Sequence, residues 1–337
     1  MRQKTFTNCQ ILNGILNRAN YFKANEHFAT AQNYMSCARS FGSYIRSRDN
    51  ANVRFTFLTV QDYSRYLLNE RRVLRNTQSF YLRFLRATFT AMGGSADLFQ
   101  DAYTKVEPTR KRALPANVIR RLEELPLQGR NAMWRDLFLF SFAARGMAFV
   151  DIAYLRRSDI RDGYIAYRRH KTGRPLTVRL EPCMQQIITR WSSPTPDTEK
   201  ASYSFPNSER ETNTTKHYYK EQCCSDYVFP VIKSTGARAF TEYQSALSAY
   251  NKALKAIAEM AGLTKSGLTK SGRATLSSYT ARHTWATSAY NAGIPVSVIS
   301  EGMGHSTEKV TRIYLAQLTP TIIDRYNHTL LRTIGFR

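Results

Sequence analysis

The sequence lacks several features that would place the protein in common functional classes. No run approaches the roughly 20 apolar residues that a membrane-spanning helix needs. Residues 1–16 have no apolar core of the kind that a secretory signal peptide carries. A Gly-rich phosphate-binding loop and an acidic metal-binding cluster are also missing. We therefore expect a cytoplasmic protein that contacts no membrane and uses no metal and no cofactor.

Cysteine is scarce, and the spacing of the cysteines gives no metal site. The chain has five, an odd number, at scattered positions: Cys9, Cys37, Cys183, Cys223 and Cys224. The adjacent pair Cys223-Cys224 lies near His217, but no second His or Cys pair completes a tetrahedral set of ligands. The pattern favours reduced, structural thiols.

Acidic residues are also few. The chain has 25 Asp and Glu against 49 Lys and Arg, which gives a formal net charge of +24. The excess is spread along the chain, because residues 1–112 contain 18 basic and 7 acidic residues and the remainder contains 31 and 18. A charge of this size attracts polyanions, DNA or RNA first. A surplus of basic residues in two successive parts of the chain is typical of a clamp around a duplex, although either part alone could be a solvated basic face.

Residues 1–104 predict a small helical bundle. The first clear helix spans 28–46 and a second spans 60–72. A third helix, ended by Gly93-Gly94, places four apolar residues on one face, namely Phe80, Phe84, Ala87 and Ala91. Three arginines largely off that face are candidate DNA contacts: Arg75, Arg83 and Arg86. The alternative for each is that it only keeps the bundle soluble.

Residues 105–115 lack periodicity and contain Pro108 and Pro115, which predicts a linker between two domains. Lys111 and Arg112 within this linker are further candidate DNA contacts.

Residues 116–337 predict a second domain that is mainly helical around one β-hairpin. The hairpin pairs 164–169 with 175–180, and Lys171 lies at the tip of its turn. Residues 192–224 predict a long loop or insertion. Helices are predicted at 116–124, 132–144, 149–155, 241–261, 280–292, 295–303, 306–315 and 321–331. The predicted fold class is therefore α+β, mainly α with a small antiparallel hairpin or sheet.

Three segments near the carboxyl end carry the candidate chemistry. They are Tyr279-Thr-Ala-Arg282-His283-Thr-Trp-Ala-Thr, then Gly302-Met-Gly-His305-Ser, then Tyr314 nine residues after His305. Together they resemble the end of the catalytic domain of the tyrosine recombinase (phage integrase) family. The helical residues 1–104 also fit the core-binding DNA domain of that family.

The resemblance implies a role for each matching residue. Tyr314 would be the nucleophile that attacks a DNA phosphodiester. Arg282 would grip the phosphate through its planar fork, and His305 would be an imidazole donor to the same phosphate. Lys171 would protonate the departing 5′ oxygen. His283 would be a packed, hydrogen-bonded support.

Two positions depart from the commonest family pattern. An arginine is usual three residues before Asp151, where this chain has Ala148, and the available arginine is Arg145. If the segment stays helical, both positions share a face and Arg145 reaches the phosphate, with Asp151 orienting an arginine. The alternative is that Arg145 is a surface arginine. Tyr279 stands where a histidine is usual, and a phenol donates a hydrogen bond there without carrying positive charge.

Both departures resemble the subgroup of the family that is common on Bacteroides-type mobile elements. The family works on double-stranded DNA as a homotetramer that joins two sites, forms a C-shaped clamp around DNA and needs neither ATP nor a metal. We accordingly expect a monomer in solution that associates with the nucleoid. The apolar tail 321–336 resembles a helix that docks on a neighbouring subunit, although it could equally pack on its own domain.

The segment before the first clear helix, residues 1–27, is too short for the extra arm-binding domain of larger integrases. This favours a simpler recombinase that integrates or inverts DNA at short core sites. Two rival functions stay open: a DNA-binding protein that has lost catalysis, and a type IB topoisomerase that shares the phosphotyrosine chemistry.

Overall fold

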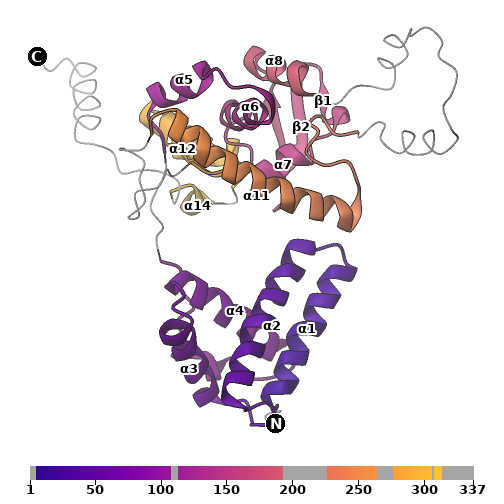
Figure 1. Cartoon of the computed structure of the whole chain (residues 1–337), viewed down its shortest axis with the longest axis vertical. Coiled ribbons are helices and arrows are strands. Elements are labelled where there is room, and N and C mark those ends of the chain that lie inside the picture. Colours follow the sequence, from indigo (N-terminus) through magenta and orange to yellow (C-terminus); the bar gives the residue numbers. More distant parts are fainter. Residues whose placement is uncertain (1–4, 108–112, 193–225, 264–275, 306, 313–337) are drawn as a thin grey trace, which may run out of the picture. The chain divides into compact units, whose positions relative to one another are not determined.

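The computed structural model describes residues 5–107, 113–192, 226–263, 276–305 and 307–312. The chain divides into two compact units, Met1–Thr109 and Arg110–Arg337 (Figure 1). The division falls within residues 105–115. No helix in the described part of the chain is long and apolar enough to span a membrane.

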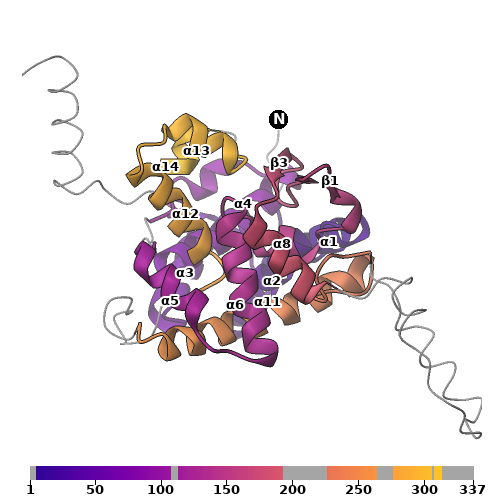
Figure 2. The same ribbon diagram turned by 90° about the horizontal axis from the view of Figure 1, so that it is seen from above.

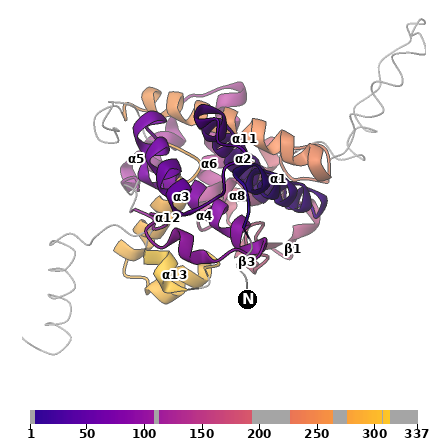
Figure 3. The same cartoon turned by 90° about the horizontal axis from the view of Figure 1, so that it is seen from below.

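The first unit is helical. Its α-helices are α1 (Asn8–Ala24), α2 (Phe28–Arg48), α3 (Phe57–Arg65) and α4 (Arg75–Ala91). A π-helical turn at Tyr66–Glu70 lies between α3 and α4, and a 3-10 turn at Ala96–Phe99 follows α4. Helices α1 and α2 pack side by side (Figure 3). Aromatic rings fill the core between the helices. The rings of Phe41 and Tyr44, for example, each lie 5.2 Å from the ring of Tyr63.

Helix α1 is absent from the sequence prediction, which begins its first clear helix at residue 28. Its signal is nevertheless present in the sequence. Thr7 caps the helix, since its hydroxyl accepts from the Gln10 N–H at 3.3 Å while its own N–H donates to the Gln10 side chain at 2.8 Å. Ile11, Ile15 and Ala19, spaced four residues apart, form the buried face.

The predicted buried face of α4 is wrong. Leu82, Leu85 and Phe89 are buried, whereas Ala87 and Ala91 are exposed. Phe80 and Phe84 are only partly buried; their rings lie 4.7 Å apart, and Phe84 packs edge-on against Tyr34. Both stripes of the helix are apolar, so the periodicity alone could not decide which one enters the core.

Where it is described, the second unit is mainly helical with one small antiparallel sheet, which confirms the predicted fold class. Its elements are α5 (Ala116–Glu124), α6 (Gly129–Ala143), α7 (Phe149–Ala153), a 3-10 turn (Arg157–Asp159), β1 (Ile160–Arg161), β2 (Tyr164–Arg168), β3 (Pro175–Arg179), α8 (Pro182–Trp191), α11 (Gly236–Met260), α12 (Thr280–Asn291), α13 (Val296–Gly302) and α14 (Glu308–Arg312). The predicted loop 192–224 lies almost wholly, and the predicted helix 321–331 entirely, outside the described residues.

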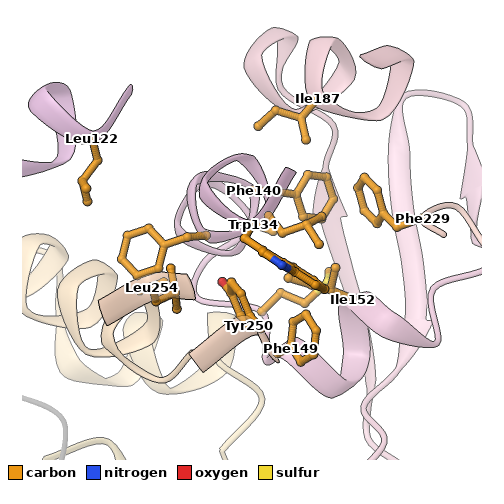
Figure 4. Close-up of a cluster of buried hydrophobic side chains, with 14 of the residues drawn as sticks. Leu122, Trp134, Phe140, Phe149, Ile152, Ile187, Phe229, Tyr250 and Leu254 are labelled. Atoms are coloured by element: carbon orange, nitrogen blue, oxygen red, sulfur yellow. The ribbon is translucent and has the colours of Figure 1, made fainter. Parts of the chain in front are cut away.

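Helix α6 forms the centre of this unit and contacts α5, α8, α11 and α12 (Figure 2). Figure 4 shows Trp134 and Phe140 of α6 among side chains from α7 and α11. The rings of Phe149 on α7 and Tyr250 on α11 stack 4.4 Å apart. Burying each such side chain stabilises the fold by about 1.5–3 kcal/mol. This core fixes the ends of α6, α7 and α12 relative to one another.

The sheet has the order β1-β2-β3, and β2 and β3 form the predicted hairpin. Arg168 pairs with Pro175 at its last register position, and the turn between them contains Lys171 and Gly173. Ile165 and Val178, paired across the strands, point into the core. The alternation of buried and exposed residues therefore leaves the turn outside the core.

Candidate active site

Arg282 is the centre of the candidate site. It lies in the first turn of α12, and only 3% of its surface is exposed. Its guanidinium donates to the Gly146 carbonyl at 2.7 Å and to the Met303 carbonyl at 2.6 Å. The same group lies 3.0 Å from Nε2 of His305. Arg282 thus ties the segment after α6 and the segment after α13 to α12.

The turn after α6 is shaped to approach Arg282. Arg145 and Gly146 both have positive φ, 57° and 71°. A Cβ at Gly146 would lie 2.7 Å from the Arg282 backbone Cα, so only glycine allows this approach. Arg145 then lies beside Gly302, with its Cδ 3.6 Å from the position a Cβ would take there. Its guanidinium donates to the Thr177 carbonyl on β3 at 3.4 Å.

The premise that Arg145 and Ala148 lie on one helix is wrong. Helix α6 ends at Ala143, Arg145 is left-handed, and Ala148 caps the separate helix α7. Arg145 and Ala148 are therefore not on one helix face. The tight turn, not a helix, brings Arg145 close to the Gly302–His305 loop.

The Gly302–His305 loop is equally constrained. Gly304 has φ 66°, and a Cβ there would lie 2.9 Å from a methyl group of Leu176 on β3. His305 is 4% exposed, and its Nδ1 lies 2.8 Å from the Thr311 hydroxyl. Because a guanidinium only donates, Nε2 of His305 accepts from Arg282 and the ring proton lies on Nδ1. The imidazole is neutral in this arrangement.

Positive charge is concentrated around His305. The pKa of His305 is lowered to about 3, first by burial and then by four nearby cations: Arg282, Arg169, Lys171 and Arg174. These cations come from α12 and from the β2–β3 hairpin. The site is therefore built to attract an anion.

Two arginines of the hairpin were not singled out from the sequence. Arg169 is buried and donates to the Gly304 carbonyl at 3.0 Å. Arg174 donates to the His305 carbonyl and, through its other nitrogen, to both carboxylate oxygens of Glu301 at 2.6 Å. The sequence is rich in arginine, so only their position beside Lys171 could have marked these two as site residues.

Asp151 on α7 holds the hairpin turn. Its carboxylate accepts from the His170 backbone N–H at 2.7 Å, and among the described residues it bonds no arginine side chain. Burial raises the pKa of Asp151, against the lowering effects of this hydrogen bond and of Arg169 and Arg282.

Lys171 and Tyr279 line one pocket of about 200 Å³ together with Asp151. Lys171 is exposed in its turn, and 43% of the Tyr279 surface is exposed where α12 begins. The ring of His283, partly buried, lies 6.4 Å from that of Tyr279. The structure thus brings together Arg145, Asp151, Lys171, Tyr279, Arg282, His283 and His305 around the start of α12.

The remaining predicted residues lie elsewhere. Arg75 and Arg83 are exposed on α4, Arg86 is partly buried there, and the Arg75 guanidinium lies 5.5 Å from the ring of Tyr103. Tyr314, Lys111 and Arg112 lie outside the described residues. Within the described part of the chain, no group of three or more His, Cys, Asp or Glu could hold a metal.

Comparison with known proteins identifies the family. Residues 112–319, more than half of the chain, match the phage integrase family. The chain therefore belongs to the phage integrase family of tyrosine recombinases. A search of characterised proteins found no match.

Solved structures share the fold at low sequence identity. The integrase of transposon Tn1549 in complex with transposon right end DNA matches with a TM-score of 0.60 and 14% identity, over 96% of this chain and 99% of that one. The XerH recombinase bound to palindromic difH in a post-cleavage complex gives 0.56 and 13%, over 89% and 79%. A λ integrase dimer bound to a core site gives 0.53 and 16%, over 92% and 77%.

Proposed function

We propose that the protein is a site-specific DNA recombinase that cleaves and rejoins strands through a 3′-phosphotyrosyl link on Tyr314. The observation that carries the proposal is that Arg282 holds three separate segments together. These are the Arg145-Gly146 turn, the start of α12 and the Gly302–His305 loop, with the Lys171 hairpin beside them. The family match over 112–319 supports the same chemistry.

The scissile phosphate would bind between Arg282 and Arg145. Arg282 is held by neutral carbonyl oxygens, so its positive charge is oriented without being cancelled by these hydrogen bonds. Negative charge builds on the nonbridging oxygens as Tyr314 attacks, and two preplaced guanidinium groups stabilise that charge.

His305 would change its hydrogen bonding when DNA binds. Its Nε2 accepts from Arg282 in the structure, whereas a donor to phosphate needs the proton on Nε2. An anionic oxygen placed beside both side chains would offset the four cations that lower the pKa of His305. The ring could then donate from Nε2 to the phosphate.

Lys171 would act on the leaving group. Tyr314 gives its phenolic proton to water and its oxygen forms a bond to phosphorus, the bond from phosphorus to the 5′ oxygen breaks, and Lys171 gives that oxygen a proton. The energy of the phosphodiester is kept in the phosphotyrosyl link. The freed 5′ hydroxyl of a partner duplex then attacks the link and releases Tyr314.

The biological role follows from the same proposal. The partner is double-stranded DNA, since the matching XerH and Tn1549 structures are complexes with DNA. We propose a homotetramer on two sites, in which residues 1–104 and the arginines of α4 contact the duplex. Integration or inversion of a mobile element of the Bacteroides type is the role we favour.

Trapping of a covalent adduct tests the proposal. A binding site is first selected from a random duplex library with the full chain, and a nicked form of that site is then incubated with the protein and denatured in detergent. We expect wild type to form a protein–DNA adduct and Tyr314→Phe to form none while still binding. Binding without an adduct in wild type would favour a DNA-binding protein that has lost catalysis. Relaxation of supercoiled DNA with no need for a site would favour a topoisomerase.

Arg145→Ala tests whether the displaced arginine serves the phosphate. We expect strand cleavage to fall roughly 10²–10³-fold, because one donor to the developing charge is lost. Binding of the intact site, measured by gel shift, should change little. Cleavage at the wild-type rate would show that Arg145 is a surface arginine.

Lys171→Ala tests whether Lys171 is the acid that protonates the leaving 5′ oxygen. The variant should cleave ordinary DNA slowly but recover on a 5′-thio bridging phosphate, whose leaving group needs no proton. A variant that stays slow on both substrates would contradict the role of Lys171.

A further inference from the structure

The β2–β3 hairpin is fastened to the Gly302–His305 loop at both ends of its turn. Arg169, just before Lys171, donates to the Gly304 carbonyl. Arg174, the last residue of the turn, donates to the His305 carbonyl and to both carboxylate oxygens of Glu301. The turn that carries Lys171 is therefore clamped to the loop that carries His305.

The two sides of this clamp differ in how firmly they are held. Met303 and Ile299 are fully buried, and Arg282 binds the Met303 carbonyl, so the loop is anchored in the core independently of the hairpin. The turn at Lys171 is exposed, and beyond the two arginines it contacts the rest of the unit through its His170, whose N–H donates to Asp151 and whose ring lies 4.7 Å from that of Tyr154. Loss of Arg174 would thus move the hairpin tip more than the loop.

From this asymmetry we propose that Arg174 is a positioning residue for Lys171. It sets the distance between the lysine and the phosphate that Arg282 and His305 would hold. The inference rests on the proposed recombinase function and on Lys171 as the acid. It assigns Arg174 no contact with DNA.

The two-point contact of Arg174 explains why an arginine stands there. The Arg174 side chain is 32% exposed and that of Glu301 is 74% exposed, so their ion pair alone contributes little. The planar fork, however, reaches a carboxylate and a backbone carbonyl at once and so fixes a direction. A lysine ammonium could keep the ion pair but would not reproduce that fork.

The test compares two substrates in the full chain. Arg174→Ala should slow cleavage of ordinary nicked DNA roughly 10–100-fold, because a shift of about 1 Å at a catalytic group has an effect of that order. On the 5′-thio bridging substrate, the variant should match wild type. Arg174→Lys should fall between the two on ordinary DNA.

Arg168→Ala is the matched control. Arg168 is an exposed arginine of the same hairpin, and it donates to the Gly173 carbonyl within the turn at 3.3 Å. Because this hydrogen bond stays within the hairpin and does not join it to the Gly302–His305 loop, Arg168→Ala should cleave ordinary DNA within about threefold of wild type.

Each other outcome overturns the inference. Equal slowing of Arg174→Ala on both substrates would place Arg174 in phosphate binding or in general stability. A wild-type rate on ordinary DNA would show that the clamp does not position Lys171. Wild type that cleaves neither substrate would overturn the recombinase function itself, and the inference with it.

Discussion

Two buried polar clusters of the second unit satisfy their charges in opposite ways. In the first, Asp136 on α6 is 2% exposed and accepts from Arg135 at 2.7 Å, Arg190 at 2.9 Å and Trp191 at 2.7 Å. Arg135 also donates to the carbonyls of Glu123 and Leu125 at the end of α5. Charge is matched by charge within this cluster, which joins α5, α6 and α8.

In the second cluster, Arg282 donates to two carbonyl oxygens and to the neutral ring of His305. The buried carboxylate nearby, Asp151, accepts its hydrogen bond from the hairpin backbone. Cations from the hairpin add to the field at His305. The comparison teaches that burial of charge serves cohesion in the first cluster and prepares for an anionic ligand in the second.

The sharpest way to break this comparison is to neutralise each buried acid. Asp136→Asn should lower the free energy of unfolding by about 3–5 kcal/mol, because Arg135 loses its buried partner and an amide donor faces other donors. Asp151→Asn should change it by less than about 1 kcal/mol, since the amide oxygen can still accept from His170 and burial already disfavours the charge.

Urea unfolding followed by tryptophan fluorescence measures both variants. The three tryptophans, Trp134, Trp191 and Trp285, all lie in the second unit, so the signal reports that unit alone. Equal losses of stability for the two variants would refute the distinction between the clusters.

A glycine pair sharpens the comparison next. Gly146→Ala should destabilise the second unit by about 2–4 kcal/mol, because a strained backbone conformation adds to an overpacked contact with Arg282. Gly163→Ala is the control. Gly163 lies in the turn between β1 and β2 with φ 75°, and a Cβ added there would have no atom within 4 Å. This variant should lose only about 1 kcal/mol. Similar losses in the same unfolding experiment would show that the approach of Arg282 is not tight.

The pH dependence of stability gives the smallest predicted effect. The pKa of His305 is lowered from 6.5 to about 3 on folding, so the unfolded chain binds more protons between these values. The contribution is complete above about pH 6.5 and is lost as pH falls toward 3. Between about pH 7.5 and pH 5, wild type should lose about 2 kcal/mol more than His305→Gln. Parallel pH curves for the two proteins would show that His305 is not buried as a neutral ring.

The sequence predicted the elements of the second unit well where periodicity and turn residues agreed. Helix α5 begins and ends where predicted, and the hairpin with Lys171 in its turn is confirmed. Helix α8 was missed, although Pro182 at its start and Met184, Ile187 and Ile188 on one face mark it. In the first unit, α4 shows that a helix with two apolar stripes does not reveal from spacing alone which stripe is buried.

The motifs located the site better than they explained its geometry. Arg282 and His305, which two separate motifs contribute, are in hydrogen-bond contact. The path of the chain at Arg145 could not be inferred, because helical spacing from Ala148 says nothing of two residues with positive φ. Arg169 and Arg174 were missed for a different reason, since their partners are backbone carbonyls 131 and more residues away.

The most direct test of the central claim is to identify the residue that carries the DNA. Tryptic digestion of a trapped adduct should release residues 313–325, Ile-Tyr-Leu-Ala-Gln-Leu-Thr-Pro-Thr-Ile-Ile-Asp-Arg, whose one tyrosine is Tyr314. Mass spectrometry after nuclease treatment should find the nucleotide remnant on that peptide. A remnant on any other tyrosine, or on a serine, would contradict the account.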